Sequence, residues 1–199
     1  TINGGKTVIT INPNSNLSST QVVYVAIGAT VEDASNNAIN AANVSFTAAD
    51  VSAPTMAITS AEVSDGASSN DSTLAMTFTS SEATSNFVVG DISVNGGALS
   101  SFNATSTTVY TATFTPSGDG AKTIDVAGGA FTDSSSNNNS AATQFNWTYD
   151  ATSPTMAITS AEVTDGATSD DSTLAMTFTT SKATSNFVVG DISVNGGAL

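Results

Sequence analysis

The chain has 199 residues, of which 39% are hydrophobic and 10% are charged, and it contains neither cysteine nor histidine. Three lysines oppose 17 acidic residues, and the formal net charge of −14 excludes nucleic acid and anionic membrane surfaces as partners, because both bind cationic side chains. The absence of cysteine excludes a disulfide framework and favours an exported protein that folds without oxidation.

Apolar residues alternate with Thr, Ser, Asn and Asp through most of the chain, which is the period-two pattern of half-buried β-strands. Turn signals such as Asp65-Gly66 separate the alternating segments. In the middle of the chain the pattern predicts about seven short strands within 100 residues, which is typical of a Greek-key β-sandwich. We expect strands near residues 8–13, 23–27, 44–46, 56–58, 74–78, 87–89, 92–94, 110–114, 124–126 and 145–149.

Residues 54–99 return almost unchanged as residues 154–199, at an offset of 100. A period near 100 residues is too long for a solenoid, whose units have about 20–50 residues, and it matches one small autonomous domain. Residues 1–52 are more distant, but they resemble the second half of the same unit. Only five of the 46 repeated positions differ: Ser64/Thr164, Ser68/Thr168, Asn70/Asp170, Ser80/Thr180 and Glu82/Lys182.

The repeat predicts three units. Residues 1–52 are the C-terminal half of a divergent domain, residues 53–152 are a complete domain, and residues 153–199 are the N-terminal half of a near-identical repeat. We expect the two halves to be parts of domains that continue in a longer protein. The alternative is that another subunit completes the open half, as in donor-strand assembly.

Three motifs of the complete unit resemble those of the bacterial immunoglobulin-like (Big) repeat domains of large cell-surface adhesins. They are TFTSSEAT followed by DISVNGGAL in residues 77–99, YTATFTP in residues 110–116, and GAFTD in residues 129–133. The resemblance covers residues 53–199 and implies an all-β chain of tandem immunoglobulin-like Greek-key β-sandwiches. It also implies an extracellular or cell-surface location, a role as extender modules, and calcium bound at the junctions between domains.

The residue types argue against an enzyme. Without histidine there is no imidazole base for a serine nucleophile, and without cysteine there is no thiolate. A Ser–Lys pair or a pair of carboxylates remains a formal alternative, but near-identical domains with Ser- and Thr-rich faces rarely build a catalytic cleft. No apolar run reaches the roughly 18 residues of a membrane-spanning helix, so we expect no membrane insertion by this segment.

Acidic residues at the expected junctions and turns make Ca²⁺ the one cofactor that the sequence suggests, because this ion prefers carboxylate, amide and carbonyl oxygens. The alternative is that these residues cap turns and keep the surface soluble. In the repeat Lys182 replaces Glu82, so a role that needs a carboxylate there is not shared by both units. The candidate ligands are Asp33, Asp50, Glu62, Asp65, Asp133, Asp150, Glu162 and Asp165.

Lys122 is a formal candidate for an intramolecular isopeptide bond with Asn146, because such bonds need a buried lysine. Its place in the AKTIDV segment puts it on the same face as Ile124. The simpler interpretation is a lysine at a solvent-exposed strand edge, where it would protect the strand from pairing with other chains.

Two functions fit the sequence. The first is a structural extender in an adhesin stalk or a surface filament, whose partners are neighbouring repeats of the same chain or like chains. The second is a module that binds carbohydrate or another surface and gains avidity from repetition. Phe145, Trp147 and Tyr149 could form a sugar platform for the second function, but we expect the face that they share to lie in the core.

Overall fold

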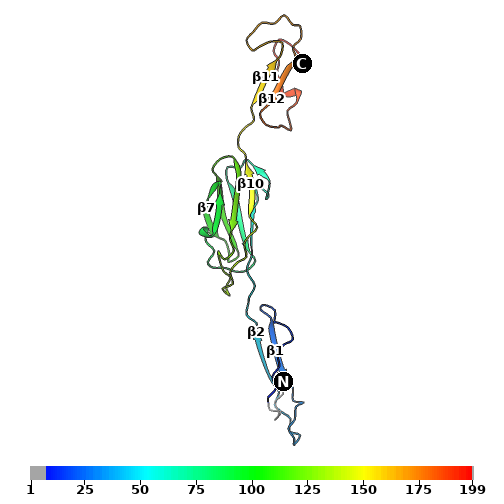
Figure 1. The fold of residues 1–199 in the computed structure, drawn as a ribbon, viewed down its shortest axis with the longest axis vertical. Coiled ribbons are helices and arrows are strands. Elements are labelled where there is room, and N and C mark those ends of the chain that lie inside the picture. Colours follow the sequence, from blue (N-terminus) through cyan, green and yellow to red (C-terminus); the bar gives the residue numbers. More distant parts are fainter. Residues whose placement is uncertain (1–7, 199) are drawn as a thin grey trace. The chain divides into compact units, whose positions relative to one another are not determined.

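A computed structural model describes residues 8–198 (Figure 1). The chain is all-β, with 38% of its residues in strands and 3% in helices, which confirms the predicted fold class. It divides into two compact units, residues 1–150 and 151–199. Within residues 8–198 the helical segments are far too short to cross a membrane.

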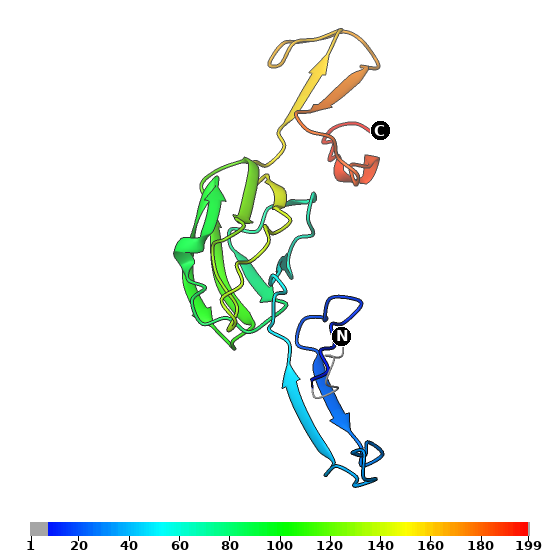
Figure 2. The same ribbon diagram turned by 60° about the horizontal axis from the view of Figure 1, so that its bottom comes forward.

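Residues 53–150 form a two-layered sandwich, whose two sheets are visible in Figure 2. One sheet has the strand order β3-β5-β8-β7 and the other the order β4-β10-β9-β6. This is the Greek-key order of a constant-type immunoglobulin domain, with an added short strand at one edge. The strands are β3 (Met56–Ser60), β4 (Ser68–Ser69), β5 (Leu74–Ser80), β6 (Ile92–Asn95), β7 (Gly97–Ala104), β8 (Val109–Pro116), β9 (Gly120–Val126) and β10 (Phe145–Tyr149).

The alternating apolar side chains of both sheets meet in one core. On β5, Leu74, Met76 and Phe78 point inward and are at most 1% exposed, while Ala75 and Thr79 point outward to solvent. Such burial of apolar area is the main term that stabilises a sandwich. The other buried hydrophobic residues are Met56, Ile58, Val63, Phe87, Ile92, Tyr110, Ala112, Phe114, Ile124, Val126, Phe131, Phe145 and Trp147.

The predicted strand over residues 87–89 is wrong. Phe87 is a buried loop residue, packed edge-to-face on Tyr110 with ring centres 5.0 Å apart. The chain then turns through the 3-10 helix η1 (Val89–Asp91), because the Asp91 carboxylate accepts a hydrogen bond of 2.8 Å from the backbone N–H of Val88. Val89 therefore points to solvent, and the alternation across this segment comes from a turn.

The interpretation of Lys122 as a solvent-edge lysine is also wrong. Lys122 lies on the core face of β9, is 4% exposed and pairs with Trp147. Its aliphatic stem passes over Gly96, where a Cβ would lie 2.6 Å from Lys122 Cδ, and the stem packs like an apolar side chain. Asn146 pairs with Thr123 instead. Since successive side chains alternate between faces, Asn146 points away from Lys122 and the proposed isopeptide geometry is wrong.

Residues 8–50 form an antiparallel ribbon of β1 (Val22–Ile27) and β2 (Ala42–Thr47). Val25 pairs with Val44 in this ribbon, as Ile124 pairs with Phe145 in β9 and β10. Both pairs are antiparallel and place apolar residues opposite one another. The strand expected over residues 8–13 is not among the strands of the described residues: Ile9 is a β-bridge residue, and the first strand is β1.

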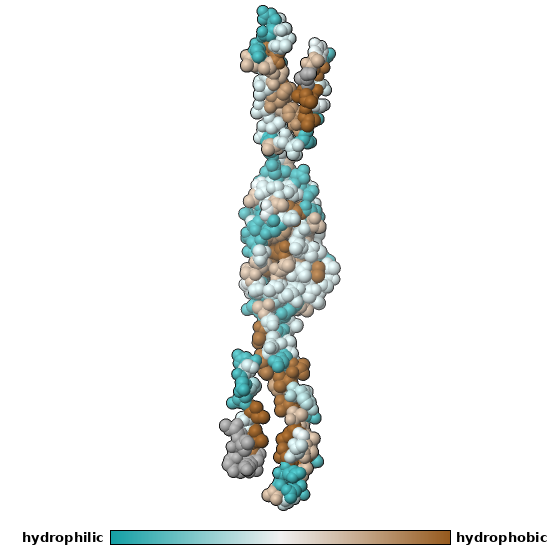
Figure 3. All heavy atoms as spheres, turned by 90° about the vertical axis from the view of Figure 1, so that its right-hand side faces the viewer, coloured by the Kyte–Doolittle hydropathy of each residue, from teal (hydrophilic) through white to brown (hydrophobic). Residues whose placement is uncertain are grey.

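Residues 151–198 form the ribbon of β11 (Met156–Ser160) and β12 (Met176–Thr180), followed by the 3-10 helix η2 (Val189–Asp191). Ile158 pairs with Phe178, as Ile58 pairs with Phe78 in the complete domain. Ile158 is nevertheless 60% exposed, against 8% for Ile58. Figure 3 shows the hydrophobic surface that this open ribbon leaves in contact with solvent.

Candidate metal centre

Three carboxylates meet where the chain enters the sandwich. Asp50 lies in the segment before β3, Glu82 follows β5, and Asp133 lies in the loop between β9 and β10. One oxygen atom from each lies within 4.8 Å of the others. Asp50 and Asp133 are among the ligands that the sequence suggests, whereas Glu82 is not.

The loop that carries Asp133 is organised by the Asp133 carboxylate itself. Oδ1 accepts hydrogen bonds from the backbone N–H groups of Ser135 at 2.8 Å and Asn137 at 2.9 Å, and Oδ2 accepts one from Asn137 Nδ2 at 2.9 Å. Such local turns are favoured by Asp. Burial acts to raise the pKa of Asp133, but the hydrogen bonds from Asn137 and Ser135 outweigh it, and the pKa is lowered.

Asp50 fastens the preceding segment to this loop. Its Oδ1 accepts hydrogen bonds from Ser19 Oγ at 2.7 Å and from the backbone N–H of Ser52 at 3.0 Å. Its Oδ2 accepts one from Ser135 Oγ at 3.3 Å, and its backbone carbonyl accepts one from Asn137 Nδ2 at 3.2 Å. The Ser19 hydrogen bond contributes most to lowering the pKa of Asp50, which keeps the carboxylate ionised.

The ionised form of Glu82 is disfavoured by its surroundings, and its pKa is raised. Loss of hydration raises its pKa most, followed by repulsion from Asp50 and by a hydrogen bond and repulsion involving Asp133. Lys122 is the only cation in the described range 8–150, and it lies near the start of β9, whereas Asp133 follows the end of that strand. The three acids therefore meet without a lysine from this part of the chain.

The donor set fits a hard divalent cation. Ca²⁺ takes six to eight oxygen ligands from carboxylates, carbonyls and water, at 2.3–2.6 Å. Asp50, Glu82 and Asp133 supply carboxylate oxygens, and Ser135 Oγ lies next to Asp50 Oδ2. There is no nitrogen or sulfur donor in the group, which disfavours zinc and other softer metals.

Two other suggested ligands accept hydrogen bonds from backbone N–H groups outside the Asp50 cluster. Asp33 organises the loop of residues 33–37 as Asp133 organises its own, with Oδ1 accepting from Ser35 N at 2.8 Å and Asn37 N at 2.9 Å. Asp65 Oδ1 accepts a hydrogen bond of 2.6 Å from the backbone N–H of Asn146, which holds the turn after β3 against β10.

The remaining suggested ligands are spread along the chain. Glu62 joins the end of β3 to the start of β5, because its Oε2 accepts from Ser60 Oγ at 2.6 Å and from Ala75 N at 3.2 Å. Glu162 makes the same two contacts in residues 151–198, at 2.6 and 3.2 Å. Asp150 donates its backbone N–H to Ser69 O at 3.1 Å, and Asp165 lies in a turn before Gly166. The structure gathers none of these four into the Asp50 cluster.

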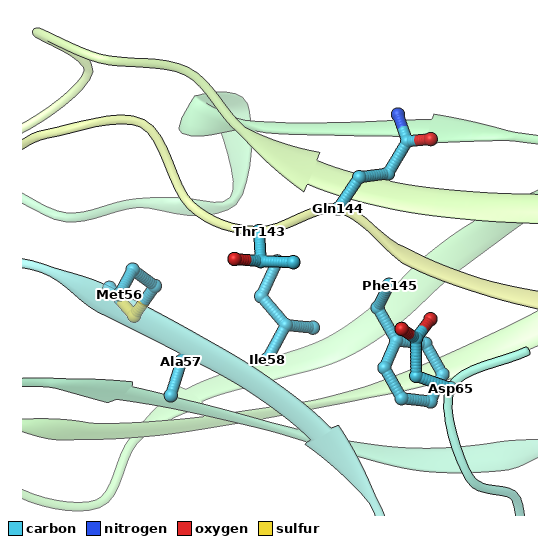
Figure 4. Close-up of a pocket in the computed structure, with 7 residues that line it drawn as sticks. All are labelled: Met56, Ala57, Ile58, Asp65, Thr143, Gln144 and Phe145. Carbon is cyan, nitrogen blue, oxygen red and sulfur yellow. The ribbon is translucent and has the colours of Figure 1, made fainter.

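A hollow of about 260 Å³ lies between β3 and the segment that leads into β10, and Figure 4 shows the residues that line it. Asp65 is the one titratable residue that lines it, and its carboxylate already binds the backbone of Asn146. The other lining residues are Met56, Ala57, Ile58, Thr143, Gln144 and Phe145. The hollow contains no acid–base or nucleophile–base pair.

The strand order of the two sheets and the core that they share define the class of an immunoglobulin-like domain. A family model described as "Bacterial Ig-like domain" matches residues 50–149, and the chain belongs to this family, as the sequence motifs suggested. Domains of the family are generally non-catalytic and typically occur in extracellular or surface proteins. Comparison with curated proteins and with solved structures found no significant match.

Glu82 is not among the ligands that the sequence suggested, although the Glu82/Lys182 pair is one of the five differences between the repeats. In residues 151–198, Lys182 occupies the corresponding position, and its Nζ donates a hydrogen bond of 2.6 Å to Thr152 O. A lysine cannot replace a carboxylate as a calcium ligand. The Asp50–Glu82–Asp133 arrangement therefore belongs to residues 50–149 and is not reproduced by the repeat.

Proposed function

We propose that residues 50–149 act as an extender domain in a larger extracellular surface protein, where they help to hold a distal binding region away from the cell. The observation that carries this proposal is that the chain enters and leaves the sandwich at opposite ends. It enters beside the segment that precedes β10, where Pro54 O accepts a hydrogen bond of 2.9 Å from Ser140 N, and it leaves after β10, where Asp150 N donates to Ser69 O.

Each such domain adds its strand length to the reach of the protein. The eight residues of β8 span about 27 Å at the rise of an antiparallel strand. Pro54 restricts the backbone of the segment that leads into the sandwich. The burial of the aromatic residues disfavours the sugar-binding alternative, since Phe145 and Trp147 are only 5% and 3% exposed.

Single-molecule stretching of the full chain tests the extender role. We expect residues 53–150 to unfold in one step with a gain of about 300 Å in contour length and to refold on relaxation, because they form one cooperative core. A panel of glycans and surface proteins should retain no ligand. Saturable binding by the folded domain to one panel member would contradict the extender role and favour the binding module.

We further propose that Asp50, Glu82 and Asp133 hold a Ca²⁺ ion that stiffens the point where the chain enters the domain. The proposal is supported by the all-oxygen donor set and by the raised pKa of Glu82. A bound cation would offset the repulsion among the three carboxylates. It would also tighten the existing attachment of Asp50 to the loop of Asp133.

Glu82→Gln tests this site. We expect the variant to melt at a higher temperature than the wild type in EDTA at pH 7, because it removes the repulsion from Asp50 and Asp133. Because the pKa of Glu82 is raised, its repulsion from the other carboxylates destabilises the fold at neutral pH. This destabilisation is lost as the pH falls through the raised pKa toward the ordinary value of 4.5. The advantage of the variant should therefore shrink over the same interval.

Calorimetry with and without Ca²⁺ completes the experiment. Ca²⁺ should raise the melting temperature of the wild type and should have little effect on Glu82→Gln. Glu32→Gln is the matched control, because it removes the same charge from an exposed residue outside the cluster. A wild type that melts at the same temperature in EDTA and in Ca²⁺ would end the calcium proposal.

A further inference from the structure

One side of the sandwich combines two open strand edges with an uncharged sequence. Among the described residues, β7 is the last strand of one sheet and β6 is the last strand of the other, and Gly96 joins them. Figure 1 shows β7 along the margin of the domain. Residues 92–118, which include β6, β7 and β8, contain no Asp, Glu, Lys or Arg, although the chain has a formal net charge of −14. A second copy of this chain therefore meets less repulsion on this side than on an acidic one.

The other edges of the sandwich are protected against pairing with another strand. Short strands, charges and proline all oppose the addition of a strand at an edge. β3 has five residues, follows Pro54 and precedes Glu62. β4 has two residues and lies between Asp65 and Asp71 in the sequence, and β6 has four residues. β7 has eight residues and contains neither a charge nor a proline, so it is the least protected edge of the sandwich.

The pairing of β7 with β8 determines which backbone groups face the open edge. Gly96 O accepts a hydrogen bond of 2.9 Å from Ser117 N, so the backbone groups of Gly96 are directed toward the β8 side. This direction alternates from residue to residue along an antiparallel strand. The N–H and C=O groups of Gly97 and Leu99 therefore face the open edge, where they can pair with another strand.

A bulge limits the length of this edge. The register between β7 and β8 shifts between Ser100 and Asn103, and Ser101 has a positive φ of 53°. Bulges bend and twist the strand that contains them, so the regular part of the edge covers residues 97–100. An edge of this length can pair with one short strand, whereas the bulge opposes the long, flat pairing of an aggregate.

We propose that two copies of this protein associate side by side through β7, with the β7 strands of the two copies antiparallel. A two-fold axis through Leu99 pairs the N–H and C=O of Leu99 with those of Leu99 in the second copy, and it places Ala98 opposite Ser100 of the second copy. This register keeps the exposed side chains of Ala98 and Ser100 on the outer face of both sheets and the half-buried Leu99 on the core side. Such a contact is isologous and closes at two copies. The proposal adds a lateral contact to the extender role and does not depend on that role.

The contact made by one domain is expected to be weak. Two short edges bury little surface, and interfaces below about 1,200 Å² are typical of transient association. The net charge of −14 also opposes association, so added NaCl should strengthen it by screening. Tandem domains that present the same edge would gain avidity, so the contact acts between arrays more strongly than between single domains.

Disulfide trapping tests this register, because the chain contains no cysteine of its own. The experiment mixes Ala98→Cys molecules with Ser100→Cys molecules and oxidises them. Opposite residues of a non-hydrogen-bonded antiparallel pair have Cα atoms about 4.5 Å apart, which suits a disulfide. The control mixes Ala57→Cys with Thr59→Cys, two exposed positions on β3, the other edge of the same sheet. We expect the mixed β7 disulfide at about ten times the yield of the control, because pairing raises the effective concentration of the two thiols.

Equal yields from the two mixtures would overturn the proposal. All four variants contain the open ribbons of residues 8–50 and 151–198, so association through those ribbons raises both yields alike and leaves their ratio near one.

Amide hydrogen exchange of the chain without cysteine gives an independent readout. The Leu99 N–H should exchange more slowly as the protein concentration rises, because pairing covers it, whereas the Ser100 N–H faces β8 and should not change. Ser100→Lys should remove this concentration dependence, since an edge lysine opposes pairing, and Thr59→Lys on β3 should retain it. Leu99 exchange that is independent of concentration, or that responds equally to the two lysine variants, would overturn the proposal.

Discussion

Phe78→Ala is expected to lower the free energy of unfolding of the complete domain by about 3–5 kcal/mol, the usual cost of removing a buried phenylalanine ring. Phe78 is 0% exposed and lies opposite Tyr110 on β8. Its ring centre is 6.0 Å from that of Phe87. The ring therefore fills the centre of the core, and the surrounding rings cannot close the cavity without leaving their own contacts.

Denaturant unfolding followed by tryptophan fluorescence measures this effect. Trp147 is the only tryptophan of the chain and is buried against Phe114, with ring centres 4.8 Å apart, so the signal reports on the complete domain alone. Phe178→Ala is the matched control, because Phe178 has the same sequence neighbours but lies in the open ribbon of β11 and β12. It should leave the transition unchanged. Equal shifts in the two variants would show that the core described here is wrong.

Gly97→Ala should be the next most damaging change, at about 3 kcal/mol, the upper part of the usual range for overpacking. A Cβ at this position would lie 2.3 Å from Phe114 Cζ and 2.4 Å from Thr115 O. The phenyl ring could move only by leaving the core, and the carbonyl oxygen belongs to the backbone of β8. The loss of stability is therefore steric, and it arises because the added Cβ forces β7 away from β8.

Gly197→Ala provides the comparison within the same chain. The nearest atom to its added Cβ is Val194 Cγ1, at 3.5 Å, which is an ordinary contact. We expect the Trp147 transition of this variant to coincide with that of the wild type. A tolerated Gly97→Ala would mean that β7 and β8 approach each other less closely than in the structure.

The alternation of apolar residues predicted most strands of the complete domain because half-buried strands impose it directly on the sequence. It could not distinguish Phe87 from a strand residue, since a loop residue anchored in the core produces the same pattern. It also placed Lys122 on the correct face, but the residue type argued for solvent. Lys122 is buried because its long aliphatic stem fits into the space above Gly96, which has no side chain.

Local sequence did not determine every strand, as the repeat shows. Residues 92–95 form β6, whereas the identical residues 192–195 form no strand. The difference is the presence of β9, which supplies the hydrogen-bonding partner. The complete candidate metal centre could not be predicted from local sequence either. It joins residues 50, 82 and 133, and only the packing of the sandwich brings three such distant positions together.

The pairing of β10 determines how the domain responds to tension. Thr148 and Tyr149 of β10 run parallel to Ser68 and Ser69 of β4, and the chain leaves directly after β10. A load along the strands therefore acts in shear on this pair and on the hydrogen bond between Asp65 and Asn146. Bonds loaded in shear break together, whereas bonds loaded in an unzipping direction break one after another, so the geometry resists rupture without requiring high thermodynamic stability.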